Sequence, residues 1–363
     1  MQVTRLTFDR FRNLETGEWK PYEGVNVILG ENGHGKTNLL EALWLFTGAK
    51  SFRGAKDSEL TAFDAEQSRL TMEFLADGRE QEAEINIKAR RSAVLNGVSQ
   101  SAASHLAGVF CGVVFSPAHL SLIKGGPQER RRLIDAAYCQ LRPTYVKTLT
   151  EYSRILTQRN ALCKAKNMDG AADELLELWD KQLAQTGCRL IHARQRYIQK
   201  MVPVAQEIYR GLSSGKETFD VRYVSTVDCI TEETAAEIAA KLYETLRAHH
   251  AADLAAGFTT VGPHRDDMEV LINGHNARSF GSQGQQRSAV LALKLAEASL
   301  LEEVTGEKPI ALLDDVMSEL DPSRQQYILN HIRDWQVFIT CCEPTPMMRD
   351  GRQFYMRDGK LST

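Results

Sequence analysis

Short apolar runs separated by turn-forming residues occupy both ends of the chain, whereas its middle has a helical period. Near the start, runs of five to seven residues have the length and composition of strands. They cover residues 3–8, 25–29, 70–74, 84–88 and 109–115. After residue 257 the pattern returns, with strands predicted at 268–272, 309–313 and 337–340 and a helix at 285–304. The two ends therefore predict an α/β core.

The middle of the chain predicts two long helices. Apolar positions step by three and four residues over 145–163 and again over 176–197. Pro143 should begin the first helix because its ring fixes φ and it lacks an N–H. A turn is expected at 167–170, and Pro203 should end or kink the second helix. Two antiparallel helices of roughly 35 to 45 Å follow from the rise per residue. The periodicity fits two interpretations equally well: the helices form a short antiparallel coiled coil, or they are amphipathic helices packed on a lobe.

A glycine-rich loop follows the apolar run 25–29. It consists of Gly30, Glu31, Asn32, Gly33, His34, Gly35, Lys36 and Thr37, and it fits the pattern of a phosphate-binding loop. Such glycines let backbone N–H groups surround the phosphates, the lysine brings a positive charge to them, and the threonine hydroxyl ligates Mg²⁺. The helical run that follows points its N-terminal dipole at the same place. The loop predicts a site for a nucleoside triphosphate with Mg²⁺.

The apolar run 310–313 ends in two carboxylates, Asp314 and Asp315. A buried strand with this ending holds Mg²⁺ and activates water beside a bound triphosphate. We expect Asp314 to reach the metal together with Thr37, and Asp315 to polarise the attacking water as the catalytic residue. Because the loop and this strand end serve one site, we predict a split ATPase core. Residues 1–115 and 257–363 form it, and residues 116–256 form a mainly helical, basic lobe inserted between its halves.

Two polar segments of the second half have more than one interpretation. Ser282 and Gly284 lie directly before the apolar helical run 289–301. A hydroxyl and a glycine backbone at a helix start form an anion site, although a serine there also serves as an ordinary helix cap. Residues 262–267, a Gly-Pro pair followed by polar positions, are typical of a tight turn.

Charge is distributed unevenly, although the formal net charge is only −3. Residues 124–210 contain 16 Lys and Arg against 9 Asp and Glu, whereas the rest of the chain has an acidic excess. This difference favours nucleic acid as a partner of the inserted lobe, through phosphate contacts that do not read sequence. The candidate DNA contacts are Arg130, Arg131, Arg132, Arg194, Arg196 and Lys200. In a two-fold dimer the basic surface is doubled.

Composition points to a soluble globular protein, because 43% of the residues are hydrophobic and 25% are charged. No run of 18 apolar residues occurs, and the first residues are too polar for a signal peptide, so we expect a cytoplasmic location and no membrane partner. The seven cysteines are scattered, and the adjacent pair Cys341 and Cys342 is not spaced like a metal site. We expect reduced thiols.

Together, the phosphate loop, the segment 282–287 and the acidic segment 312–321 resemble the ABC-type ATPase heads of the SMC class. Within that class, Phe11-Arg12-Asn13 and residues 262–267 are similar to the RecF family. The resemblance spans essentially the whole chain. It implies a fold in which the split ATPase head carries an inserted helical lobe.

In heads of this class, the serine-glycine signature of one copy completes the ATP site of another copy. The resemblance therefore implies an ATP-dependent homodimer in which Ser282, Gly284 and Gln285 act in trans on ATP held by a second copy. It also implies that Arg12 contacts the nucleotide beside the phosphate loop. The cofactors implied are ATP and Mg²⁺.

The resemblance further implies ATP-dependent DNA binding in recombinational repair and replication restart. The protein would clamp DNA at gaps or single-strand/duplex junctions, help to load recombinase, and have RecR and RecO as partners. Asp315 stands where many ABC ATPases carry glutamate, one methylene longer, so we expect a weak DNA-stimulated ATPase whose slow hydrolysis resets the protein. After the strand at 337–340, no histidine occupies the place of the transporter switch residue, which is absent or replaced by Thr340.

Two other classes of protein also use such a loop. A small-molecule kinase has no need of a signature such as Ser282, and a GTPase would require a base-reading Asn-Lys-x-Asp motif that this chain lacks. A transporter-type ATPase subunit fits poorly with the missing switch histidine and the inserted basic helices. These alternatives predict different oligomeric responses to ATP.

Overall fold

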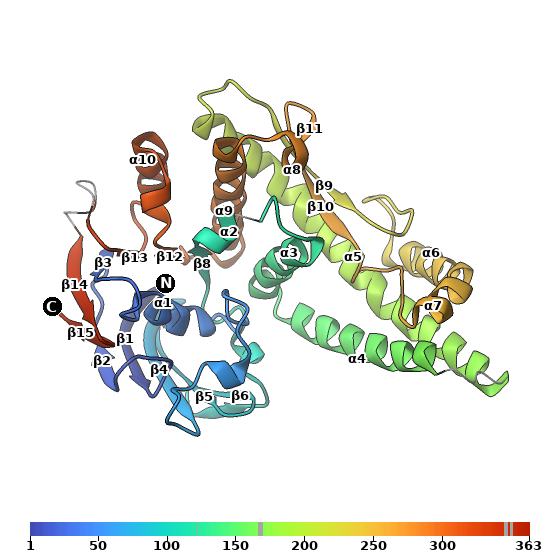
Figure 1. The fold of residues 1–363 in the computed structure, drawn as a ribbon, viewed down its shortest axis with the longest axis horizontal. Helices are drawn as coiled ribbons and strands as arrows, with labels where there is room; N and C mark the ends of the chain where they lie inside the picture. The colour runs from blue at the N-terminus through green and yellow to red at the C-terminus, as the bar shows by residue number, and fades with distance from the viewer. Residues whose placement is uncertain (121, 166–169, 345–347, 349–350) are drawn as a thin grey trace. The chain divides into compact units, whose positions relative to one another are not determined.

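The computed structural model describes residues 1–120, 122–165, 170–344, 348 and 351–363, and it divides into two units (Figure 1). The loop unit contains Met1–Ser121, Val204–Thr218 and Gln283–Thr363, and the insert unit contains Leu122–Pro203 and Phe219–Ser282. These boundaries correct the predicted ones. Residues 257–282 belong to the insert unit, because the strand Asp267–Ile272 pairs with Phe219–Val224.

One sheet of the loop unit leads into the phosphate loop. Its order is β15-β14-β3-β13-β12-β8. The strands are β3 (Val25–Leu29), β8 (Gly112–Phe115), β12 (Ile310–Asp314), β13 (Val337–Cys341), β14 (Arg352–Arg357) and β15 (Lys360–Ser362). Neighbours are parallel except β14 and β15. The nearly continuous burial of β3, β8, β12 and β13 is typical of parallel strands covered on both faces.

A second, antiparallel sheet of the loop unit has the order β2-β1-β4-β5-β6-β7. Its strands are β1 (Gln2–Asp9), β2 (Gly17–Trp19), β4 (Ser68–Ala76), β5 (Arg79–Ile87), β6 (Arg91–Leu95) and β7 (Val98–Gln100). Alternate residues of β4 are buried, as expected when one face of a sheet meets a core. One face of this sheet therefore packs against the hydrophobic core of the loop unit.

The helices of the loop unit include two that are buried on nearly every side. The described elements are α1 (Lys36–Leu45), α2 (Pro117–Leu120), α9 (Gln283–Thr305), α10 (Pro322–His331) and the 3₁₀ turns η1 (Asp57–Glu59), η2 (Ala103–Leu106) and η3 (Val316–Glu319). Helix α1 is buried almost throughout and shares one hydrophobic cluster with strands of both sheets. Helix α9 is buried for most of its length and contacts β8. Both helices that begin at phosphate-site motifs are thus fixed by core packing.

The insert unit is mainly helical. Its elements are α3 (Pro127–Leu141), α4 (Thr144–Lys164), α5 (Gly170–Leu212, whose last residues belong to the loop unit), β9 (Phe219–Val224), α6 (Ala235–Ala248), α7 (His250–Ala256), β10 (Asp267–Ile272), β11 (His275–Asn276) and α8 (Ala277–Phe280). The strands form a small antiparallel sheet in the order β11-β10-β9. One hydrophobic cluster joins α4, α5 and α6.

The two predicted long helices are present as α4 and α5, which run antiparallel (Figure 1). Both contribute to the core shared with α6, so their apolar stripes also serve the packing of the lobe. Helix α5 continues through Pro203 to Leu212 and has 43 residues, which makes it longer than predicted. Positions 167–169 of the predicted turn lie outside the described residues. None of the described helices combines the length and apolar character needed to cross a membrane.

Candidate nucleotide site and the surrounding residues

The phosphate loop connects β3 to α1 through glycines in unusual backbone conformations. Gly33 and Gly35 have φ values of 88° and 109°, which glycine adopts at no steric cost. A Cβ on Gly35 would also lie 2.9 Å from Oδ1 of Asn13. Helix α1 begins at Lys36, so its first free N–H groups point into the loop. The loop thus has the backbone conformation and the helix start that a phosphate-binding loop requires, and its contact with phosphate remains a prediction.

The Lys36 ammonium lies among oxygen atoms of the loop. Its Nζ donates to the carbonyl oxygens of Gly30 at 2.7 Å and Glu31 at 3.1 Å, and the Sγ of Cys342 is 3.8 Å away. The side chain is 3% exposed. A lysine fixed in this way is already ordered at the loop, so binding a phosphate would cost little side-chain entropy.

Thr37 and Asp314 come together as predicted for a metal site. The Thr37 hydroxyl donates to Oδ1 of Asp314 at 2.7 Å, and the Thr340 hydroxyl donates to the same oxygen at 3.0 Å. Burial raises the pKa of Asp314, while these hydrogen bonds oppose that change. A hydroxyl and a carboxylate are oxygen ligands that suit Mg²⁺, which completes its shell with waters and phosphates. No group of three or more His, Cys, Asp or Glu that could hold a metal occurs among the described residues.

Asp315 has the left-handed backbone conformation, with φ of 49°. Its N–H donates to Oγ1 of Thr340 at 3.0 Å, and its carbonyl accepts from the Ser318 hydroxyl at 2.7 Å. Burial raises the pKa of Asp315, and the charge of Lys36 acts in the opposite direction. Hydrogen bonds to the N–H and to the carbonyl of Asp315 therefore hold its strained backbone in place. Strained backbone conformations of this kind are common at functional sites.

Arg12 is positioned against the first helix of the loop unit. Its guanidinium makes two hydrogen bonds to the Glu41 carboxylate, at 2.9 and 3.0 Å, and a third to the carbonyl of Glu59 at 3.0 Å. Glu41 is fully buried in α1. The pair fixes Arg12 next to the loop, and a contact with the nucleotide remains a prediction.

Two supports of the loop were missed at the level of sequence. Asn13 donates from Nδ2 to the carbonyl of Gly33 at 2.9 Å, and it accepts from Asn38 at 2.6 Å. The turn between β14 and β15 holds His34, because the N–H of Asp358 donates to its Nδ1 at 2.8 Å. Asn13 follows Arg12 directly, which was a usable signal, but nothing in the sequence links residue 358 to the loop.

The predicted signature lies at the start of a different helix, α9, which belongs to the loop unit. Ser282 is exposed and directly precedes α9. Arg287 of α9 donates to the carbonyl of Glu319 at 2.8 Å, and Arg324 of α10 donates to the Ser288 hydroxyl at 2.8 Å. In Figure 1, α1 and α9 do not lie side by side. Hydrogen bonds therefore connect the start of α9 to the residues that follow β12.

Gln285, the third predicted signature residue, is tied to a segment that the sequence assigned to the inserted lobe. Its Nε2 donates to Oε1 of Glu217 at 2.6 Å. The other oxygen of this carboxylate accepts from the Tyr209 hydroxyl at 2.6 Å. The end of α5 and the residues after it therefore brace the start of α9 within the loop unit.

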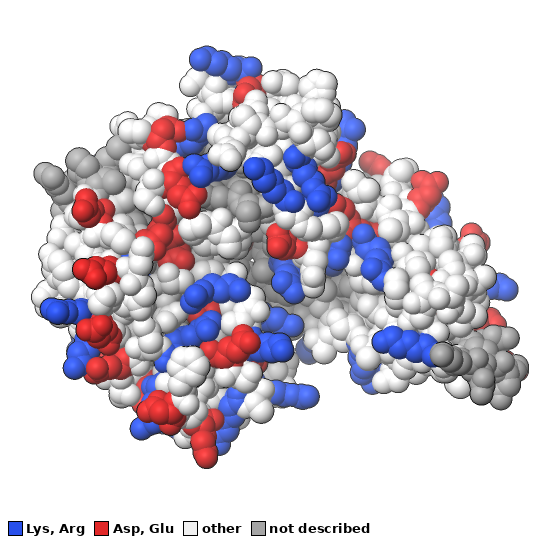
Figure 2. Space-filling view, in the orientation of Figure 1, with Lys and Arg blue, Asp and Glu red and all other residues white. Residues whose placement is uncertain are grey.

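The predicted DNA contacts differ in their exposure to solvent. Arg130 and Arg194 are each 3% exposed and are paired with Asp267 and Asp135 through two hydrogen bonds of 2.7 to 2.9 Å. These two predictions are wrong, because the guanidinium groups are used inside the insert unit. Arg131 is half-buried, whereas the remaining candidates, Arg132, Arg196 and Lys200, are exposed. Basic and acidic side chains are interspersed on the face shown in Figure 2.

The fold and the site define a class of protein. A phosphate loop, an acidic strand end beside it and a separate serine-glycine helix start, on a split α/β core, are the parts of an ABC-type ATPase head of the SMC class. A model of the RecF/RecN/SMC N terminal domain matches residues 2–358. Proteins named DNA replication and repair protein RecF match nearly the whole chain. The one from Syntrophotalea carbinolica is 38% identical over 99% of both chains, and the one from Caldanaerobacter subterraneus subsp. tengcongensis is 39% identical over 94% of both. The chain belongs to the RecF family.

Solved structures agree with this assignment. The structure of the recombination mediator protein RecF with ATP, of the RecFOR pathway, has a TM-score of 0.92 and 37% identity, and the match covers 99% of this chain and 97% of that one. The Smc head domain from Pyrococcus furiosus, at 16% identity and a TM-score of 0.54, shares the fold alone. Family membership displaces the kinase and transporter alternatives.

Proposed function

We propose that this chain is an ATP-dependent DNA-binding protein of recombinational repair and replication restart, and that ATP joins two copies of it on DNA. The observation that carries the proposal is the separation of two phosphate-binding motifs. Lys36, Thr37 and Asp314 form one part of a site, and helix α9, which starts directly after the exposed Ser282, begins elsewhere in the loop unit. A second copy supplies the missing part, which makes ATP the link between copies.

The loop unit has the groups needed to bind and slowly hydrolyse ATP. Thr37 and Asp314 would hold Mg²⁺, which neutralises charge on the phosphates. Lys36 binds the β and γ oxygens, Arg12 contacts the nucleotide, and Asp315 orients water. The short Asp315 side chain reaches less far than glutamate, so turnover is slow. ATP binding acts as a switch, and hydrolysis resets it.

The insert unit is the DNA-binding part of the proposal. Arg196 and Lys200 are exposed one turn apart on α5, and Arg132 is exposed on α3. From residue 181 to 206 the chain contains no Asp or Glu. Exposed cations on a stretch of sequence without acidic residues suit contacts with phosphates of either strand. In the dimer these surfaces are paired and clamp duplex DNA next to a gap or junction.

The cellular role rests on the relatives. Their name places them in DNA replication and repair, and the similar solved structure belongs to the RecFOR pathway. We propose the same pathway for this chain, with RecR and RecO as partners and recombinase loading at single-strand/duplex junctions as the outcome.

Sedimentation with and without ATP tests the core of the proposal. The wild-type chain should be monomeric with ADP and dimeric with ATP and Mg²⁺. DNA affinity should then be measured at one salt concentration for single-stranded, duplex and gapped substrates. Tighter binding of gapped DNA with ATP than with ADP is expected. A chain that stays monomeric with ATP, or that binds all substrates equally with both nucleotides, would refute the proposal.

A further inference from the structure

The segment 262–267 is a junction of the insert unit rather than an isolated turn. Gly262 has φ of 112°, and a Cβ there would lie 3.0 Å from the Tyr152 hydroxyl. The buried Asp266 accepts hydrogen bonds from Tyr223 and from the backbone N–H of Thr226, at 2.5 and 2.8 Å. Asp267 receives the two hydrogen bonds from Arg130 described above. Within this junction, Arg265 is an exposed residue.

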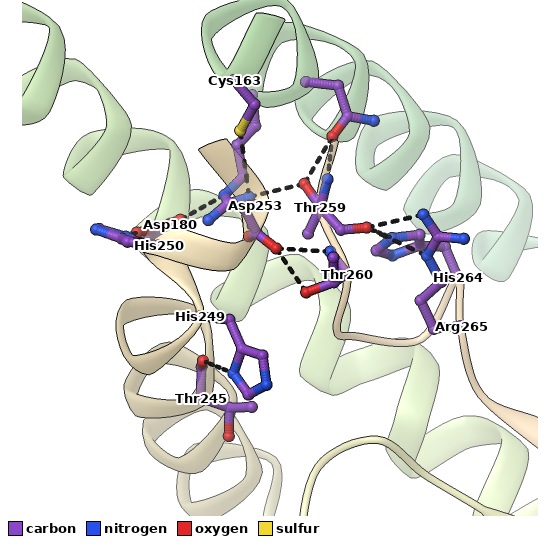
Figure 3. Close-up of polar contacts among 12 residues, drawn as sticks. Cys163, Asp180, Thr245, His249, His250, Asp253, Thr259, Thr260, His264 and Arg265 are labelled. Atoms are coloured by element: carbon purple, nitrogen blue, oxygen red, sulfur yellow. Dashed lines mark hydrogen bonds and ion pairs between the residues drawn. The ribbon is translucent and has the colours of Figure 1, made fainter. Parts of the chain in front are cut away.

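Thr259, which precedes this segment, is fixed by a buried charged cluster (Figure 3). Arg159 is fully buried and donates to Asp180 at 2.6 Å, to Asp253 at 2.7 Å and to the Thr259 hydroxyl at 2.8 Å. The Thr259 N–H and hydroxyl both donate to Oδ1 of Asn160 at 2.7 Å. Burying three charges is costly even when they are paired. The cluster is thus a rigid support for Thr259.

Arg265 uses this support. Its Nε and Nη2 donate to the carbonyl oxygen of Thr259 at 3.2 and 3.0 Å, and His264 reaches the same oxygen at 3.0 Å (Figure 3). The centre of the guanidinium also lies 4.7 Å from the centroid of the Phe258 ring, which is 40% exposed. The Nε–Nη2 edge of the guanidinium is therefore held by a carbonyl oxygen, and one of its faces lies over an aromatic ring; both partners are neutral. The opposite edge, formed by Nη1 and Nη2, carries the N–H groups that remain available.

Arg265 differs from three buried arginines of the insert unit. Arg130, Arg159 and Arg194 are buried and paired with aspartates. In the part of the chain that the structure describes, no carboxylate pairs with Arg265 and its Nη1 makes no hydrogen bond. Holding an exposed arginine in one position costs side-chain entropy. Here no ion pair among the described residues offsets that cost.

We infer that Arg265, held over Phe258, is a pre-positioned binding site for a phosphate diester of the nucleic-acid backbone. The inference rests on the proposed DNA-binding function and adds a contact that the charge pattern did not single out. The free end of a guanidinium matches two phosphate oxygens, and Phe258 fixes its plane. Because the backbone carries the phosphate, this contact is independent of sequence.

Two substitutions at one position separate charge from geometry. Arg265→Ala should weaken binding of gapped DNA about tenfold in the presence of ATP, and it should lower the slope of log affinity against log salt by about one phosphate contact. Arg265→Lys keeps the charge but loses the planar pair of donors, so it should keep the slope and lose part of the affinity. Phe258→Leu should have a smaller effect in the same direction as Arg265→Ala.

Arg222→Ala is the matched control, because Arg222 is an exposed arginine of the same unit that is paired with Asp220. It should bind DNA like the wild type. All variants should dimerise with ATP as the wild type does, which separates this inference from the proposed function. If the wild type binds DNA and Arg265→Ala binds it equally at every salt concentration, the inference fails alone.

A direct readout avoids substitution altogether. Phenylglyoxal modifies free arginines, and mass spectrometry follows the modification of Arg265 in the wild-type chain. Gapped DNA should protect Arg265, and inorganic phosphate at the same ionic strength should protect it less. Protection by phosphate alone would assign a free anion and overturn the assignment to DNA. Protection by neither would overturn the site itself.

Discussion

The hydroxyl of Thr340 lies 3.0 Å from Oδ1 of Asp314, although 26 residues separate them in the chain. Parallel pairing of β12 with β13 brings the two residues opposite each other at the ends of their strands. The same hydroxyl accepts the N–H of Asp315, so one side chain fixes both acidic residues. Since Thr37 approaches Asp314 from α1, the carboxylate is oriented from two directions, as ligands of a metal commonly are.

Thr340→Val tests this arrangement, because valine keeps the branched shape and removes the hydroxyl. The buried Asp314 loses one donor, and the expected cost is about 1 to 3 kcal/mol of unfolding free energy. ATP turnover should fall about tenfold or more, because Asp314 and Asp315 both lose a fixed position. Thr340→Ser restores the hydroxyl and is the control. Equal turnover in the valine variant and the wild type would contradict the positioning role.

Asp315→Asn should separate ATP binding from hydrolysis. Asparagine tolerates the left-handed conformation at this position, so the fold should be retained. The amide cannot polarise water as the carboxylate does, and the ATP-bound dimer should therefore accumulate and stay on DNA longer. Single-turnover hydrolysis and dissociation from DNA measure the two effects. An unchanged hydrolysis rate would remove Asp315 from the catalytic role.

Ser282→Arg should abolish pairing by ATP without abolishing binding of ATP. The new side chain occupies the place where the nucleotide of a second copy is expected, whereas the phosphate loop is a separate segment of the chain. Nucleotide affinity should change less than about threefold, which is under 1 kcal/mol. Sedimentation with ATP and Mg²⁺ is the measurement. Ser153→Arg, on the exposed side of α4, is the control, and it should dimerise normally. A dimer of the Ser282 variant would exclude the composite site.

The loop and the acidic strand end were predictable from sequence because each is a continuous segment with its own pattern. Gly30 to Thr37 follows an apolar strand directly, and Asp314 ends another one. Their meeting follows from the general rule that the carboxyl ends of parallel strands lie at one edge of a sheet. By contrast, β14 was not predicted; only Phe354 and Met356 are buried in it, and exposed residues flank each of them except on the Gln353 side.

The charge pattern was a less accurate guide to the DNA contacts, because it does not show which cations are already paired. The partner of Arg130 is 137 residues away, and the partner of Arg194 is 59 residues away. Only the fold brings these pairs together. The same limitation hid the role of the segment after Gly262, whose aspartates bind donors from α3 and from the residues around β9.

The buried and the exposed candidates for DNA contact should respond differently to substitution. Arg130→Ala and Arg194→Ala leave Asp267 or Asp135 without its partner, and they should lower the free energy of unfolding by about 3 kcal/mol. Arg196→Ala with Lys200→Ala should leave stability within about 0.5 kcal/mol of the wild type. This double variant should instead weaken DNA binding and reduce its salt dependence. DNA binding that survives the double substitution unchanged would exclude this face of α5.

His264 should make stability depend on pH. Its Nε2 lies 3.0 Å from the Thr259 carbonyl oxygen, to which it can only donate, and its Nδ1 lies 2.8 Å from the Tyr152 hydroxyl, from which the neutral ring accepts. Burial lowers the pKa of His264 to about 4, while the Thr259 hydrogen bond opposes this and the charges of Arg265 and Arg131 add to it. In the unfolded chain the ring has its ordinary pKa of about 6.5.

The sign of the effect follows from these two values. Between about pH 6.5 and pH 4 the unfolded chain binds a proton that the folded chain does not, so the free energy of unfolding falls as the pH falls. The full difference is about 3 kcal/mol, and it is complete below about pH 4.

His264→Gln removes the titrating ring and should reduce the slope of stability against pH in this range, even if it lowers stability at pH 7.5. Denaturant unfolding at several pH values measures both. Burial also lowers the pKa of His119, to about 3, but it does so in both proteins, and its contribution cancels in the difference. Equal slopes in the two proteins would show that His264 does not titrate between the folded and unfolded states.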